Sequence, residues 1–185
     1  MVKVRISFLL LTLLWISALW AQENYEKLPG YVDLKGIDEF KNADETVEVF
    51  ITKPLLKLVA SFSSGQDSSL ANLLSGLALI RVEKFDIPKK KLKKVTKLIQ
   101  RTSKELESKH WIRMLRAKEK DEHVEIFIKE DKGHVAGLLI MSVKKDKEAV
   151  FVNIVGKIDM DQLGKLSKKF DIPKLDSLPR EKGKK

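Results

Sequence analysis

Histidine is the side chain best suited to acid–base and metal chemistry near neutral pH, and this sequence of 185 residues has three of them. They are His110, His123 and His134. All three stand at the start of an expected strand or in a turn, and their spacing matches no zinc signature. The chain has no cysteine, which excludes disulfides, thiolate metal sites and a cysteine nucleophile. We therefore predict exposed turn histidines, no metal site and no cofactor.

Motifs for nucleophilic or phosphate chemistry are also missing from the sequence. The stretch Ser63-Ser64-Gly65 lacks the Gly-x-Ser-x-Gly elbow of serine hydrolases. No glycine-rich loop of the Walker or dinucleotide type occurs. The carboxylates are interleaved with lysines, as on solvated surfaces. We predict no catalytic residue and favour a binding module over an enzyme. The alternative is a hydrolase or metal-dependent enzyme whose site residues meet only in the folded chain.

The basic residues are concentrated in one segment. The formal net charge of the chain is +10, and residues 89–109 hold nine basic and two acidic residues. In the helix expected from Pro88, apolar residues recur every three or four positions and the lysines take the other side. This pattern predicts a solvated helix face, or a docking face for an acidic partner or anionic lipid headgroups. The candidate docking residues are Lys90, Lys93, Lys94, Lys97, Arg101 and Lys104. No aromatic residues are interleaved with them to stack on bases, so nucleic acid is not an expected partner.

Hydrophobic periodicity predicts the elements that must position these residues. Alternation predicts a strand over 47–51, and Pro54 marks the start of a helix. A second short helix, a buried strand from Leu77 and the long basic helix come next. Four strands with short polar breaks then follow, so neighbouring strands of this meander must be antiparallel. These strands are expected at 111–117, 123–129, 135–143 and 150–158, before a last helix that begins at Asp159.

This order of elements predicts a single α+β domain. We expect a two-layer sandwich, in which a mostly antiparallel sheet carries helices packed on one face. The domain is placed at 47–173. It follows an extended leader at 22–46, with a helical turn near Ile37–Phe40, and precedes a basic, disordered tail at 174–185.

An apolar patch on the sheet is the sharpest binding hypothesis. If helices cover only one face, apolar side chains on the other face would be exposed, and such patches usually mark an interface. The candidate interface residues are Phe127, Leu138, Ile140, Phe151 and Val155. The alternative is that the last helix or the leader covers this face and makes it core.

The first 21 residues resemble a secretory signal. Lys3 and Arg5 precede an apolar run from Ile6 to Trp20, and Ala21 offers a small residue at the cut. We predict cleavage after Ala21 and a periplasmic or secreted protein, without a lipid anchor because there is no cysteine. Leu19 stands where a small residue is preferred, so an uncleaved anchor is the alternative.

Several stretches of the chain look like one bacterial family. They are Val47–Leu58, Lys84-Phe85, Val124–Glu130 and Asn153–Met160. Over about residues 47–170, the chain resembles the family catalogued as domain of unknown function 4252. The resemblance implies an exported or lipid-anchored envelope protein of the Bacteroidetes type, and it implies no activity for any residue.

We therefore expect an exported, non-enzymatic domain that binds an unknown protein or an envelope component. A second copy of the chain, in a homodimer, and an anionic membrane surface are further possible partners.

Overall fold

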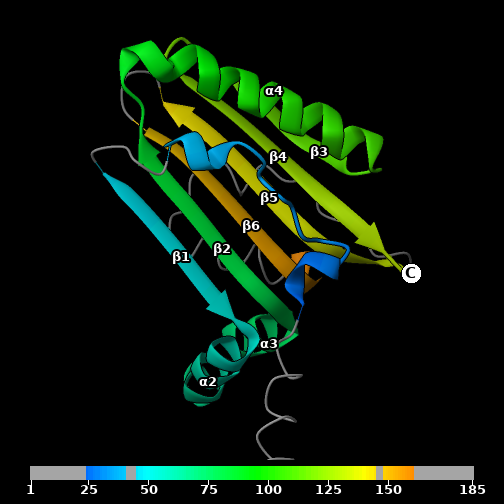
Figure 1. Ribbon diagram of the computed structural model, residues 1–185. Coiled ribbons are helices and arrows are strands. Elements are labelled where there is room, and N and C mark those ends of the chain that lie inside the picture. Colours follow the sequence, from blue (N-terminus) through cyan, green and yellow to red (C-terminus); the bar gives the residue numbers. More distant parts are fainter. Residues whose placement is uncertain (1–23, 41–44, 145–147, 161–185) are drawn as a thin grey trace, which may run out of the picture.

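The computed structural model describes residues 24–40, 45–144 and 148–160, which form a six-stranded antiparallel sheet with helices (Figure 1). The strands are β1 (Thr46–Thr52), β2 (Leu77–Asp86), β3 (Ile112–Lys118), β4 (Glu122–Asp131), β5 (His134–Lys144) and β6 (Glu148–Ile158). Their order across the sheet is β1-β2-β6-β5-β4-β3. The predicted α+β class and the four-strand antiparallel meander, β3 to β6, are confirmed.

The helices are α2 (Lys53–Ser63), α3 (Ser68–Gly76) and α4 (Leu92–Ser108), with 3₁₀ turns η1 (Tyr25–Lys27), η2 (Ile37–Phe40) and η3 (Lys89–Lys91). Pro54 stands in the first turn of α2, where its missing N–H has no intrahelical partner to lose. The long helix begins at Leu92 rather than Pro88, because η3 takes up the residues between them. No helix in the described ranges is long and apolar enough to cross a membrane.

One face of the sheet is covered by α4 and by the leader that runs from Asn24 to Phe40 (Figure 1). The buried side chains between these layers come from all three parts: leader residues such as Ile37, helix residues such as Ile99, and sheet residues such as Phe127. The ring of Phe40 stacks on Phe85 with centroids 4.9 Å apart, and Phe85 stacks on Phe151 at 5.9 Å. The leader therefore belongs to the hydrophobic core, and the predicted helical turn at Ile37–Phe40 is confirmed as η2.

The opposite face of the sheet carries a second apolar cluster. It includes Val124, Ile126 and Ile128 of β4 and Leu138 of β5. The helices α2 and α3 lie at the end of β1 and β2 and contribute Leu56 and Leu74 to this cluster (Figure 1). The predicted signal segment, last helix and basic tail lie outside the described residues.

Candidate binding surfaces

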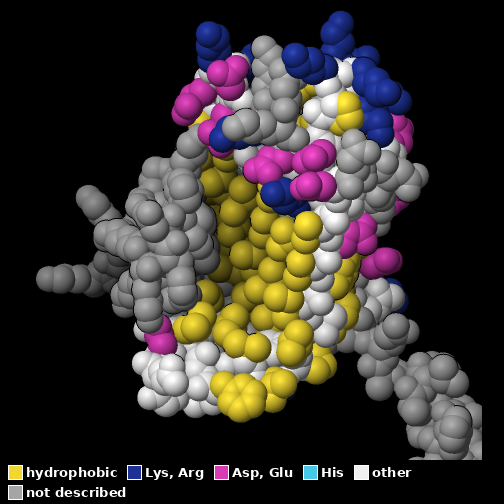
Figure 2. All heavy atoms as spheres, turned by 90° about the vertical axis from the view of Figure 1, so that its left-hand side faces the viewer, with side chains coloured by type: hydrophobic (Ala, Val, Ile, Leu, Met, Phe, Trp, Pro, Cys, Tyr) yellow, Lys and Arg dark blue, Asp and Glu magenta, His cyan; other side chains and the backbone are white. Residues whose placement is uncertain are grey.

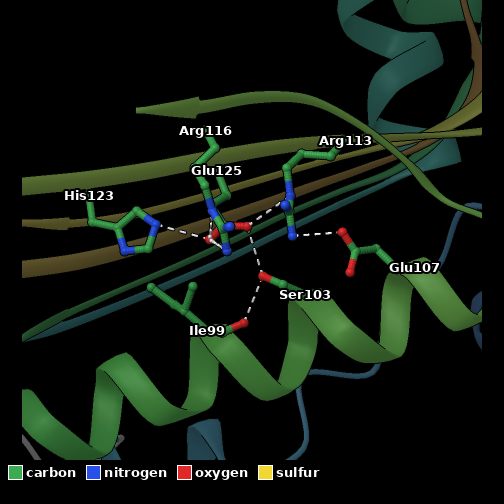
Figure 3. Close-up of polar contacts among 7 residues, drawn as sticks. All are labelled: Ile99, Ser103, Glu107, Arg113, Arg116, His123 and Glu125. Carbon is green, nitrogen blue, oxygen red and sulfur yellow. Dashed lines mark hydrogen bonds and ion pairs between the residues drawn. The ribbon is translucent and has the colours of Figure 1, made fainter. Parts of the chain in front are cut away.

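A buried carboxylate, Glu125 on β4, holds the densest polar cluster between the sheet and α4 (Figure 3). Its Oε1 lies 3.0 Å from Nη2 of Arg116 and 2.9 Å from Nε2 of His123. Its Oε2 lies 2.9 Å from the hydroxyl of Ser103 on α4. Nε of Arg113 is 3.3 Å from Oε2 but is misaligned for a hydrogen bond, so this contact is an ion pair. Arg113 also reaches Glu107 on α4, at 2.7 Å from Nη2.

This geometry suits a structural tether better than a catalytic group. A general base or nucleophile needs a free lone pair directed at a substrate. Both oxygens of Glu125 are already engaged by four side chains, and the carboxylate has no exposed surface. These polar contacts link β3 and β4 to α4, because Arg113 and Arg116 come from β3, and Ser103 and Glu107 from α4. The cluster therefore positions the long helix on the sheet.

The five candidate interface residues do not share a surface, so the predicted apolar patch is wrong. Phe127 and Phe151 are 0% exposed and lie in the core beneath α4 and the leader. Val155 is buried as well. Leu138 and Ile140 point to the opposite face, in the second cluster.

A bulge in the β4–β5 hairpin explains why Leu138 and Ile140 lie on the other face from Phe127. The turn pairs Asp131 with His134, and a regular hairpin would then place Phe127 opposite Leu138. The pairing shifts by one residue between Lys129 and Glu130, so Phe127 lies opposite Leu139 instead. A one-residue shift sends every side chain beyond it to the other face of the sheet.

The candidate basic docking residues do lie together on the surface. All of them are exposed. Lys90 belongs to η3, and α4 directs the other five away from the sheet because its apolar residues face the core. The whole set comprises Lys90, Lys93, Lys94, Lys97, Arg101 and Lys104. We call this set the basic face. Dark blue side chains gather at the α4 end of the molecule in Figure 2.

The leader contacts two residues of the basic face. Nζ of Lys94 lies 3.2 Å from a carboxylate oxygen of Glu39, and Arg101 donates to the backbone carbonyl of Lys35. Gly36 adopts φ +91°, and a side chain there would meet the guanidinium of Arg101. An open groove of about 370 Å³ lies between the leader and α4, lined by Phe40, Leu98 and the basic side chains around them. Lys93 and Lys104 lie outside this groove.

Sequence reasoning missed an apolar surface on α2. Leu55, Leu58, Val59 and Phe62 are 46%, 51%, 41% and 73% exposed. Their spacing of three, four and seven residues places them on one side of the helix, which we call the α2 stripe. Only Leu56 and Ala60 of this helix are buried. In Figure 2, hydrophobic side chains cover the hollowed middle of the molecule and continue to the end opposite the basic residues. The signal was present in the sequence, because the apolar residues cover too wide an arc for a helix with one core-facing side.

The three histidines lie apart from one another. His110 follows α4 with φ 61°, His123 contacts Glu125, and His134 begins β5. Within the described residues, no group of three or more His, Asp or Glu side chains could hold a metal ion.

A family model described as "Domain of unknown function (DUF4252)" matches residues 40–166. The chain belongs to this family. The match spans most of the sequence, from η2 through all six strands. No curated protein and no solved structure matches the chain.

Proposed function

We propose that this member of the family is an exported binding module without enzymatic activity, which holds a protein partner on the α2 stripe. The observation that carries the proposal is the exposure of four large apolar side chains on one short helix. A solvated helix of a monomeric domain normally presents polar side chains on that side, and a contiguous apolar patch usually marks an interface. Phe62, with 73% of its surface exposed, is the expected anchor of the contact.

A protein partner fits the α2 stripe better than a membrane does. A helix that lies on an anionic membrane needs its apolar side and the basic residues of the protein to meet the same surface. Here the basic face on α4 and the α2 stripe lie at opposite ends of the molecule (Figure 1). A flat bilayer in contact with one of them is out of reach of the other.

Site-specific photo-cross-linking tests this proposal in cells. A benzophenone side chain in place of Phe62 or Leu58 is expected to give one defined protein adduct. The same group at Lys57, which is exposed and lies on another side of α2, is the matched control and is expected to give none. No adduct at position 62, or an adduct to lipid alone, would overturn the assignment of a protein partner.

Export is part of the same proposal and has its own test. The basic start, the apolar run and Ala21 support cleavage before Gln22. The intact mass of the protein isolated from the envelope fraction should correspond to Gln22–Lys185. A mass that includes residues 1–21 would support the uncleaved anchor instead.

A second candidate function, binding to an anionic lipid surface, is favoured by the basic face. Six exposed cations lie on one side of the molecule, and only Lys94 among them has a paired carboxylate in the described structure. The mature protein should then sediment with phosphatidylglycerol vesicles and be released by salt, because screening weakens contacts between exposed charges. Lys97→Glu with Lys104→Glu should abolish this binding, whereas Lys57→Glu on α2 should leave it unchanged.

A further inference from the structure

The edge strand β1 has few of the features that normally prevent pairing with another chain. Native edge strands are usually protected by a bulge, a proline or a central lysine. The residues Thr46–Thr52 contain neither proline nor lysine, and Glu48 is their only charged residue. The pairing of β1 with β2 runs over all seven residues without a register shift. Val47 and Phe50 are about half exposed.

The other edge of the sheet differs in its charge and in the regularity of its pairing. β3 carries three cations in seven residues, Arg113, Arg116 and Lys118. Its pairing with β4 shifts between Arg113 and Leu115, which marks a bulge or irregularity. Both are devices that discourage edge-to-edge association. The sheet therefore has one protected edge and one edge suited to pairing.

We propose that β1 pairs antiparallel with β1 of a second copy about a twofold axis at Val49, which joins the two sheets. In a twofold antiparallel pair, residues directly opposite each other must point to the same face. The register centred on Val49 is the one that pairs all seven residues of the strand, with Thr46 opposite Thr52 of the second copy. Val47 then lies opposite Ile51, and Val49 opposite itself.

Charge and side-chain packing favour this register. Glu48 lies opposite Phe50 of the second copy and not opposite Glu48, so no like charges meet across the pair. The row Val47, Val49 and Ile51 already continues onto Val82 and Ile80 of β2, so pairing extends one apolar face across both copies. The guanidinium of Arg81 lies 5.2 Å from the ring centroid of Phe50 and holds that ring over the opposite face.

The position of β1 also suits a second copy of a strongly basic chain. The basic face lies on α4, across the molecule from β1 (Figure 1). Joining two β1 edges therefore keeps the two basic faces apart. Because the pair is antiparallel, the two α2 helices lie at opposite ends of the shared edge, and nothing in the argument for pairing uses the α2 stripe. The inference is thus independent of the proposed function.

A single engineered cysteine tests the register directly, because the chain has none of its own. Directly opposed antiparallel residues have Cα atoms about 4.5–5.5 Å apart, within the range that a disulfide spans. The mature protein with the substitution Val49→Cys should form a disulfide-linked dimer rapidly under mild oxidation. Ser61→Cys, exposed on α2, reports random collision and should cross-link far more slowly.

Sedimentation equilibrium of the mature, unmodified chain completes the test. We expect a monomer–dimer equilibrium that Val47→Lys weakens by about tenfold, since the lysine would face Ile51 at both symmetry-related positions. Ser61→Lys should leave it unchanged, and circular dichroism should show that both variants are folded. A monomer at all concentrations, or Val49→Cys cross-linking no faster than Ser61→Cys, would overturn the inference. Preferential cross-linking of Phe62→Cys would show that two copies meet through the α2 stripe instead.

Discussion

The hydroxyl oxygen of Ser103 lies 2.9 Å from Oε2 of Glu125, and this contact joins α4 to β4. The same hydroxyl lies 2.8 Å from the carbonyl oxygen of Ile99, so its one proton is placed between two acceptors. Both side chains are buried. The contact therefore fixes where along the sheet the long helix sits.

Glu125→Gln should destabilise the fold without altering either proposed binding surface. The glutamine side chain has no negative charge to neutralise Arg113 and Arg116. Its NH₂ group would also face hydrogen-bond donors that now bind a carboxylate oxygen. Both arginines are partly solvated, so we expect a loss of about 1–3 kcal/mol in the free energy of unfolding. Urea denaturation measures this loss. Glu107→Gln, an exposed partner of Arg113, should cost less than about 1 kcal/mol, and an equal cost would contradict the tether.

Asn153 on β6 attaches the leader to the sheet. Its Oδ1 accepts a hydrogen bond from the backbone N–H of Val32 at 3.0 Å, and its Nδ2 donates to the carbonyl of Gly30 at 3.0 Å. The leader backbone comes so close to β5 here that a Cβ on Gly30 or Gly137 would collide with the other chain segment.

Asn153→Leu should therefore leave backbone groups of the leader without partners. We expect a loss of about 2–4 kcal/mol in the free energy of unfolding. Hydrogen exchange should show that the amide of Val32 loses protection, while amides of β4 keep theirs. If the amides of Val32 and of β4 lost protection from exchange equally, the leader and the sheet would open as one unit.

The strands were predictable because alternation is a local property of the sequence. The pairing register was not, because it depends on a bulge between Lys129 and Glu130 that no local pattern marks. This shift of one residue determines that Leu139, and not Leu138, lies opposite Phe127. The α2 stripe was missed for a related reason: helical spacing identified apolar residues, but only packing against the sheet selects Leu56 and Ala60 as core.

Substitutions at Phe127 and Phe62 should therefore have opposite outcomes. Phe127→Asp puts a charge in the core beneath α4 and should cost more than about 4 kcal/mol, enough to unfold a domain of ordinary stability. Phe62→Asp on the α2 stripe should change the free energy of unfolding by less than about 0.5 kcal/mol. Thermal unfolding followed by circular dichroism compares the two. A folded Phe127→Asp protein would mean that this face of the sheet is not core.

The ion pair at the end of α4 gives a pH dependence with a definite sign. Nζ of Lys109 donates to Oε1 of Glu105 at 2.7 Å, and this hydrogen bond holds the pKa of Glu105 below its ordinary value of 4.5. A carboxyl whose pKa is lower in the folded state stabilises the fold above its unfolded pKa. That contribution is lost as the pH falls from 4.5 through the folded value.

Stability measured at neutral and acidic pH should show this loss. Because Glu105 is more than one-third exposed, we expect Glu105→Gln to cost only about 0.3–0.5 kcal/mol at pH 7. The difference between wild type and variant should shrink as the pH falls from 4.5 and vanish below the folded pKa of Glu105, where the wild-type carboxyl is protonated. Lys109→Met should weaken the same pH dependence, because it removes the hydrogen bond that lowers the pKa of Glu105 most. A difference that grows as the pH falls would mean that Glu105 is stabilised in its protonated form, with its pKa raised rather than lowered.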